Sequence, residues 1–177
     1  RQDDQVKIRG HRVEIGEVEV ALVDLPGIKQ AVVVAHAGAT GSPQLVAYLV
    51  ATPGTEPAVS AVRQALAERL PDYMLPSAFV WLPELPKTTS GKVDKKALPA
   101  PERKRPTLGV PFRQPTAGAE QHVAQLWAEL LQLDEIGADD NFFELGGNSL
   151  LAQKTVATLH KRHHYAVPIT KLYQFPT

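Results

Sequence analysis

The sequence predicts two unlike folded units: a small α+β subdomain, built from an antiparallel hairpin with helices, followed by an all-α helical bundle. Three observations support this division. Up to about residue 98, short β-rich runs alternate with helical patterns, which is typical of a small α+β domain. Prolines then crowd a short stretch, and the apolar spacing after it is helical throughout. We therefore expect a subdomain at 1–98, a linker at 99–115 and a bundle at 116–177.

The elements of the first unit are predicted from apolar spacing and from the breakers between them. Ile15, Val18 and Leu22 share one face of a helix, since residues three and seven positions apart lie on the same side. Glycines and a proline separate two β-rich runs, which is typical of an antiparallel hairpin. In chain order, the predicted elements are a strand at 5–8, a helix at 15–22, strands at 31–35 and 45–50, a helix between Pro57 and Pro71, and a strand at 77–82.

The linker is predicted from its five prolines, because proline lacks both the amide hydrogen and the backbone freedom that a regular helix needs. We expect a semi-extended spacer between the folded units. Residues 101–117 hold four basic and one acidic side chain, a net charge of +3, whereas residues 118–177 hold four basic and seven acidic, a net charge of −3. An acidic domain behind a basic linker suits a protein that docks on other protein surfaces.

The second unit is predicted to be helical. Its first helix carries one wide apolar stripe, made of Val123, Leu126, Trp127, Leu130 and Leu131. A second helix begins at Ser149, and a short last helix is expected over 168–177.

The inward face of the helix that begins at Ser149 is predicted to consist of Ala152, Val156 and Leu159, which lie at i, i+4 and i+7. Leu150 lies on a different face, among polar residues. An apolar side chain on a polar face is a candidate contact for a partner protein, and we assign Leu150 and its neighbour Leu151 to this role.

The composition excludes several classes of function. Lysine and arginine (19) balance aspartate and glutamate (19), so no global field favours nucleic acid or an anionic membrane. No apolar run is long enough to span a bilayer, and no signal peptide is visible. The chain has no cysteine, which excludes disulfides and thiolate metal sites and is compatible with the cytoplasm, where we expect the protein. The three histidines at 160, 163 and 164 have no accompanying carboxylate, and no metal site is predicted.

One stretch offers a serine hydroxyl as an attachment point. Residues 140–150 read D-N-F-F-E-L-G-G-N-S-L, in which two glycines allow a tight turn just before Ser149. A serine at the start of a helix feels the positive end of the helix dipole, and it can also serve simply as an N-cap. The G-x-S-x-G elbow of hydrolases is excluded, because Leu151 stands where the second glycine is needed.

The whole phrase resembles the phosphopantetheine-attachment motif of peptidyl and acyl carrier domains, D-x-F-F-x-L-G-G-x-S-L. The resemblance implies that Ser149 Oγ carries 4′-phosphopantetheine. Because carrier domains normally end in a further helix, it also implies that the last helix of this unit is missing from the chain. Asn148 stands where histidine or aspartate is common in these domains, a difference that bears on partner choice and leaves the serine chemistry unchanged.

Two further stretches resemble the C-terminal subdomain of adenylate-forming enzymes. Residues 1–19 read R-Q-D-D-Q-V-K-I-R-G-H-R-V-E-I-G-E-V-E, and residues 70–99 contain L-P-D-Y-M-L-P-S followed by P-K-T-T-S-G-K-V-D-K-K-A-L-P. The resemblance implies that Lys92 is the catalytic lysine. Activation of a carboxylate by ATP accumulates negative charge, which a cation delivered into a closed site offsets. A loop lysine without this motif would be taken as a solvated charge.

The same resemblance implies roles for further residues of this subdomain. Asp3 matches the hinge about which the subdomain rotates between its two reactions, and the Arg9-Gly10 loop then lines the path of the pantetheine arm, with Lys7 as a further substrate-side candidate. The segment L-P-A-P, through Leu98, Pro99 and Pro101, resembles the start of adenylation–carrier linkers and is expected to pack back on the subdomain.

This order of domains resembles a module of a nonribosomal peptide synthetase. The chain is then expected to be a fragment, inactive alone, with ATP and Mg²⁺ bound mainly by a large N-terminal adenylation subdomain. Implied partners are that subdomain, a phosphopantetheinyl transferase, and condensation, thioesterase, reductase or tailoring domains. Two alternatives stay open: a carrier that serves only as a docking module, and an adenylation–carrier pair from another system, such as an aryl- or fatty-acid loading module or a carboxylate reductase.

Overall fold

The computed structural model describes residues 5–38 and 41–177, and within them the chain forms two compact units that divide between Glu102 and Arg103. Asp3, the predicted hinge, lies outside the described residues. Within the described ranges, every helix is too short or too polar to cross a bilayer. Each unit has its own core, so we describe them one at a time.

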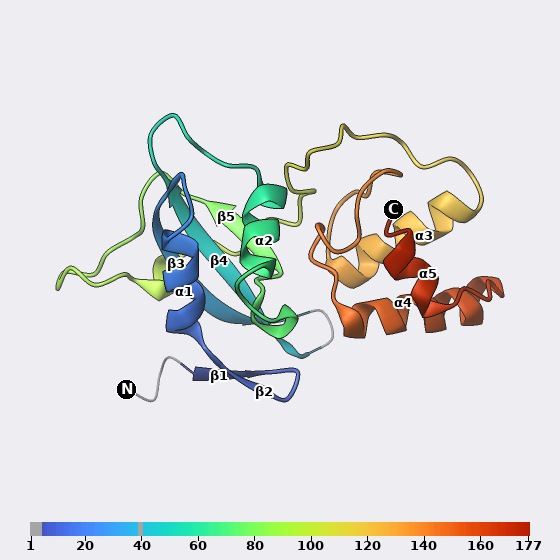
Figure 1. Ribbon diagram of the computed structural model, residues 1–177, viewed down its shortest axis with the longest axis horizontal. Helices are drawn as coiled ribbons and strands as arrows, with labels where there is room; N and C mark the ends of the chain where they lie inside the picture. The colour runs from blue at the N-terminus through green and yellow to red at the C-terminus, as the bar shows by residue number, and fades with distance from the viewer. Residues whose placement is uncertain (1–4, 39–40) are drawn as a thin grey trace. The chain divides into compact units, whose positions relative to one another are not determined.

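The first unit is built on a three-stranded sheet in the order β3-β4-β5 (Figure 1). Strands β3 (Ile28–Ala37) and β4 (Pro43–Ala51) form the predicted antiparallel hairpin, with Val33 opposite Ala47. Strand β5 (Ala78–Trp81) pairs with β4 in parallel, because the chain returns through helix α2 (Val59–Ala67) before it rejoins the sheet. The sequence analysis placed these strands correctly and did not predict the parallel pairing.

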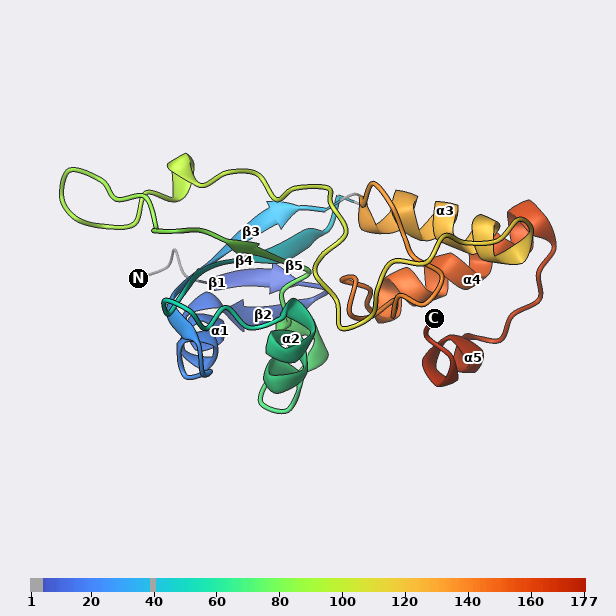
Figure 2. The same cartoon turned by 90° about the horizontal axis from the view of Figure 1, so that it is seen from above.

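The two faces of this sheet are covered differently, as Figure 2 shows. Because side chains alternate along a strand, Val33 and Ala47 face helices α1 (Ile15–Val23) and α2, while Val32 and Tyr48 face the opposite way. The opposite face is covered by the segment between Leu82 and Leu98, which carries no long helix or strand. The unit therefore has a helical layer, a sheet and a loop layer.

A second, two-stranded sheet precedes α1. Strands β1 (Gln5–Ile8) and β2 (His11–Glu14) pair antiparallel, and Ile8 and Val13 bury their side chains in the core on the helical side. Strand β2 was not predicted, because Val13 is its one buried apolar residue and the pattern around it is polar. Two short 3₁₀ turns, η2 (Asp72–Met74) and η3 (Lys95–Ala97), complete the unit.

The second unit contains three helices: α3 (Ala119–Leu131), α4 (Ser149–His163) and the short α5 (Ile169–Gln174). This confirms the predicted all-α character. Trp127 and the fully buried Phe142 meet at the centre of the core, with ring centroids 4.9 Å apart. Whether a further helix completes the bundle stays a prediction.

The buried face of α4 differs from the predicted one. Its buried residues are Leu151, Ala152, Thr155 and Leu159, whereas Val156 is half-buried. Thr155 is accommodated because its hydroxyl donates to the carbonyl of Leu151, 2.8 Å away. The assignment of Leu151 to a partner contact is therefore wrong, since its side chain is 2% exposed and belongs to the core.

The linker differs most from expectation, because it is not a spacer over its whole length: from Arg103 onward it belongs to the second unit. Residues 103–116, which we call the strap, belong to the second unit. The carbonyl of Arg103 accepts from the Asp134 amide at 2.6 Å, and the carbonyl of Arg113 accepts from the Ala138 amide at 2.8 Å. Leu108 is buried in the core that contains Trp127. The prolines prevent a helix, as predicted, but most of the linker is a packed part of a domain.

Candidate attachment site and lysine loop

The turn before Ser149 is held by hydrogen bonds among its own residues. Asn141 Oδ1 accepts from the Phe143 amide at 2.9 Å, and the Asn141 carbonyl accepts from Leu145 at 3.0 Å. The Phe142 carbonyl accepts from the Gly147 amide at 2.9 Å. These bonds close residues 141–147, which we call the attachment turn, into a compact loop around the buried ring of Phe142.

Two glycines are needed in this turn for different reasons. Gly146 adopts a φ of 108°, which side chains rarely tolerate. At Gly147 the limit is space: a Cβ atom there would lie 2.4 Å from Cε1 of Phe142 and 2.6 Å from its carbonyl oxygen. The double glycine lets the chain pass directly over Phe142 and enter helix α4.

Ser149 is the first residue of α4 and is exposed. The helix cap is its neighbour: Asn148 Oδ1 accepts from the Leu151 amide at 3.0 Å. Within the described part of the chain, Ser149 Oγ takes part in no hydrogen bond. The hydroxyl is therefore not the helix cap. It lies at the N-terminal end of α4, where the helix dipole favours negative charge. Leu150 beside it is half-buried.

We predict that Gly147→Ala destabilises the second unit by roughly 1–3 kcal/mol, because the new methyl group must displace a buried ring and a backbone carbonyl. Hydrogen exchange of the α4 amides measures this directly, since it reports the local free energy of opening. Gly16→Ala is the control: its methyl group enters open space on α1, and α4 exchange should stay unchanged. Equal α4 exchange in both variants would contradict the steric role of Gly147.

Lys92 is exposed and directly follows a tight turn, residues 88–91, in the loop layer of the first unit. Lys87 and Val93 form an isolated antiparallel bridge at its base, and the Thr88 amide donates to the Lys92 carbonyl at 2.7 Å. Gly91 closes the tip with a φ of 81°. Val93 packs against the sheet, so the turn presents the ammonium group from an anchored base.

The Arg9-Gly10 turn lies on the helical side of the same unit, where it joins β1 to β2. Both residues have positive φ, 47° and 82°. Arg9 is fastened rather than free: its Nη1 donates to Asp72 Oδ2 at 2.9 Å and its Nη2 to the Asp72 carbonyl at 3.1 Å. The ring of His11 stacks on Tyr73, with centroids 4.1 Å apart. Lys7 is exposed on β1.

The candidate residues of the first unit are therefore not one cluster. Lys92 belongs to the layer anchored on the Tyr48 face of the sheet, whereas the strand next to Arg9 buries Ile8 in the core on the helical side. The two groups are thus anchored on different sides of the subdomain.

The start of the linker lies against the sheet of the first unit. Leu98 packs on the cluster around Tyr48, and the hydroxyl of Tyr48 donates to the Pro99 carbonyl at 2.7 Å. Burial raises the pKa of Tyr48 above its ordinary value, so this donor keeps its proton. Pro101 is half-buried.

Several of these supporting residues were missed from the sequence. Asp72 stands inside the quoted L-P-D-Y-M-L-P-S stretch, yet nothing in that stretch indicates Arg9, 63 positions away, as its partner. Tyr48 is the one hydroxyl in an apolar strand, which signals a buried hydrogen bond but not the acceptor. Arg105 was read as part of a basic linker.

Comparison with known proteins agrees with this geometry. Residues 17–92 match the AMP-binding enzyme C-terminal domain, and residues 121–177 match the phosphopantetheine attachment site family. Tyrocidine synthase 3 of Brevibacillus parabrevis is 45% identical over 100% of this chain, and bacitracin synthase 3 of Bacillus licheniformis is 43% identical over 100%. The chain corresponds to only 3% of the length of each of those relatives.

Solved structures show the same pair of domains. A holo nonribosomal peptide synthetase protein with adenylation and carrier domains, bound to a vinylsulfonamide inhibitor, matches with a TM-score of 0.60 and 33% identity over 92% of this chain and 24% of its own. A four-domain holo synthetase bound to AMP and glycine matches with a TM-score of 0.54 and 37% identity, over 100% of this chain and 13% of its own.

The chain thus joins the C-terminal subdomain of an adenylate-forming enzyme to a phosphopantetheine carrier domain. It belongs to the nonribosomal peptide synthetase family, of which it represents an adenylation C-terminal subdomain with its carrier.

Proposed function

We propose that this chain supplies two working parts of an amino-acid-activating synthetase: the C-terminal lid of the adenylation domain and the carrier that receives the activated amino acid. The observation that carries the proposal is Ser149. Its hydroxyl is exposed, it is free of capping duty, and it stands at the first residue of a 15-residue helix, behind a turn that only glycine can form.

Ser149 suits a covalently held phosphate. Its Oγ lies at the positive end of the α4 dipole, where a phosphodiester is stabilised. Asn148 keeps the first turn closed, so the attachment point does not fray. When bound, the phosphopantetheine supplies a thiol that accepts the aminoacyl group as a thioester. The role of this chain is to hold that arm at a fixed, solvent-facing position.

Lys92 is proposed to act in the first reaction, formation of the aminoacyl adenylate. Its ammonium group would approach the reacting carboxylate and the α-phosphate of ATP, where negative charge accumulates. The turn that carries it is anchored by Val93 and closed by Gly91, so it can deliver the charge with little loss of order. ATP and Mg²⁺ would be held mainly by the larger N-terminal adenylation subdomain.

The second reaction, transfer to the carrier, is proposed to use the opposite side of the subdomain. Rotation about Asp3 would withdraw Lys92 and bring the Arg9-Gly10 turn to the pantetheine path, with Lys7 nearby. The separation of Lys92 and Arg9 on two faces of one subdomain supports this proposal. Gly10 offers no side chain to obstruct a passing arm, and a Cβ there would meet no atom within 4 Å.

The proposed partners follow from these roles. A phosphopantetheinyl transferase must recognise the start of α4, and condensation, thioesterase, reductase or tailoring domains must then receive the arm. Half-buried Leu150 is the candidate contact for them. We place the protein in the cytoplasm, which supplies ATP and coenzyme A.

The test is the mass of the chain after incubation with a phosphopantetheinyl transferase and coenzyme A. We expect a gain of one phosphopantetheine group. Trypsin should place it on the peptide 114–154, which contains two hydroxyl residues, Thr116 and Ser149, and fragment ions should assign it to Ser149. An unchanged mass would leave a carrier that acts only as a docking module. Modification at Thr116 would overturn the assignment of the site.

A further inference from the structure

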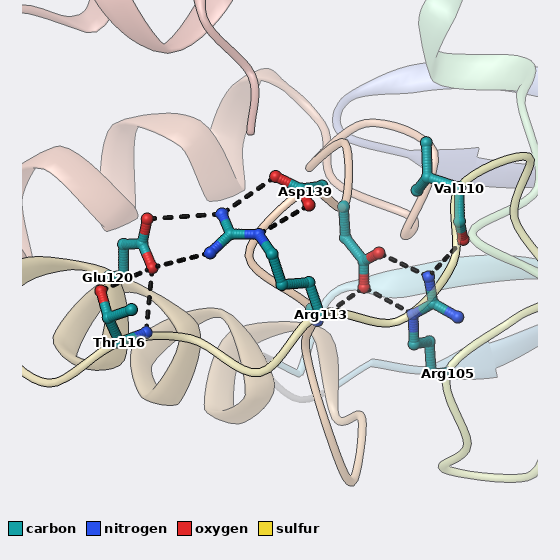
Figure 3. Close-up of polar contacts among 8 residues, drawn as sticks. Arg105, Val110, Arg113, Thr116, Glu120 and Asp139 are labelled. Carbon is teal, nitrogen blue, oxygen red and sulfur yellow. Dashed lines mark hydrogen bonds and ion pairs between the residues drawn. The ribbon is translucent and has the colours of Figure 1, made fainter.

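The strap is attached to the carrier through a buried ion pair (Figure 3). Arg105 Nε donates to Asp140 Oδ2 at 2.7 Å, and its Nη2 donates to Asp140 Oδ1 at 2.6 Å. The Asp140 side chain is 0% exposed and that of Arg105 13%. The hydrogen bond to Asp140 raises the pKa of Arg105, so the guanidinium keeps its charge.

Each member of this pair also makes a hydrogen bond to the backbone. Asp140 Oδ2 accepts from the Gly137 amide at 2.7 Å, and Arg105 Nη2 donates to the Val110 carbonyl at 3.0 Å. Buried ion pairs of this quality are costly to break from one side, because the remaining charge stays in a poorly solvated position. Removal of Arg105 would leave the Asp140 carboxylate in that state.

The second arginine of the strap provides a contrast. Arg113 donates to Asp139 at 2.7 Å and lies 3.5 Å from Glu120, but all three side chains are between 42% and 51% exposed (Figure 3). Exposed pairs of this kind contribute little to stability. Arg105 is thus the arginine of the strap that forms a buried ion pair in the carrier.

Asp140 leads directly to the attachment turn. It immediately precedes Asn141, which accepts two amides of the turn, and Phe142, whose ring fills the space beside Gly147. Gly147 is followed by Asn148, which caps α4 at Ser149. The residues from Asp140 to the helix end that carries the hydroxyl are therefore consecutive, and they are held by hydrogen bonds within the turn and by packing on the buried ring of Phe142.

We propose that Arg105 is a positioning residue for the modification of Ser149. This inference rests on the proposed function of the carrier. By neutralising Asp140, Arg105 holds the attachment turn in the form that a phosphopantetheinyl transferase must recognise. Without it, the carboxylate must reach water, which pulls Asn141 and Phe142 out of place and loosens the turn under Ser149. A linker residue 44 positions before the serine thereby becomes part of the attachment site.

The experiment compares variants of the whole chain by the rate at which the transferase and coenzyme A add mass. We expect Arg105→Ala to lower kcat/KM by about tenfold or more, since small misplacements of a reacting group are costly. The matched control is Arg162→Ala, which removes an exposed ion pair with Glu129 at 2.9 Å and should change kcat/KM by less than about twofold. Circular dichroism must show both variants folded at the assay temperature.

A rescue separates positioning from general loss of contacts. In Arg105→Ala, a further Asp140→Asn change removes the unpaired charge and keeps an acceptor for Gly137. We expect the double variant to be modified faster than Arg105→Ala alone, whereas a simple sum of lost contacts makes it slower. If Arg105→Ala unfolds, Arg105→Lys decides instead: it keeps the charge and loses the two-pronged contact, and we expect a lowered rate.

A rate for Arg105→Ala equal to that of Arg162→Ala would overturn the proposal, as would a wild-type rate for Arg105→Lys. A double variant slower than Arg105→Ala would also overturn it. Absence of any modification on the wild-type chain is a different outcome, because it contradicts the proposed function of the carrier itself.

Discussion

Ser149→Ala is expected to abolish aminoacyl loading of the intact synthetase module while its ATP–pyrophosphate exchange stays within about twofold of wild type. The loss is complete because no other hydroxyl occupies the start of α4. Exchange is retained because adenylate formation does not require the carrier. Radiolabelled amino acid bound to the protein measures loading, and exchange measured on the same preparation shows that the adenylation domain is intact.

The neighbouring cap supplies the control for this experiment. Asn148→Ala removes the oxygen that accepts from the Leu151 amide and is expected to cost the carrier about 1 kcal/mol, yet it keeps the hydroxyl. Ser149→Ala should cost almost nothing in stability, since Asn148 caps the helix. We therefore expect opposite patterns: a stable chain that cannot be loaded and a weakened chain that can. Loading of Ser149→Ala would refute the attachment role.

Lys92→Ala is expected to have the opposite effect on the two partial reactions of the same module. ATP–pyrophosphate exchange should fall by about 10²–10³, which is the usual cost of removing one group that stabilises developing charge in a closed site. Transfer to the carrier from chemically supplied aminoacyl adenylate should fall far less, because the proposed rotation withdraws the lysine in that step. Measuring both partial reactions separates a catalytic role from damage to the fold, which would lower them together.

Lys87→Ala is the matched control for Lys92. Lys87 is exposed at the base of the same turn, where it forms the bridge with Val93. It carries the same charge and lies on the opposite arm of the turn from Lys92. We expect exchange within about threefold of wild type for this variant. If Lys87→Ala and Lys92→Ala lowered exchange equally, the charge of the loop as a whole, and not one positioned ammonium group, would be responsible.

What the sequence could predict was largely local. The hairpin of β3 and β4 followed from two β-rich runs separated by glycine and proline breakers, and α4 followed from a turn of two glycines and the apolar run after it. The inner face of α4 was harder, because Leu150, Leu151 and Val156 offer two alternative apolar stripes around one helix. Packing against Trp127 and Phe142 decides between them, and the helix sequence alone does not contain that information.

The strap could not be predicted for a related reason. Its prolines correctly excluded a helix, but the acidic partners of Arg105 and Arg113 lie between 7 and 35 positions away along the chain. The opposite net charges of linker and carrier were visible in the composition and were assigned to docking on other proteins. In the structure, part of that charge is paired within the carrier itself.

The strap also shortens the free linker between the two domains. The Pro99 carbonyl is bound by Tyr48 at one end and the Arg103 carbonyl by Asp134 at the other, so three residues join the anchor points instead of the seventeen of the whole proline-rich stretch. Three residues can bridge about 10 Å, against about 60 Å for seventeen. Such a connection limits how far the carrier can move from the subdomain. If the proposed function holds, longer movements of the bound aminoacyl group would come from the prosthetic arm or from rotation of the subdomain together with the carrier.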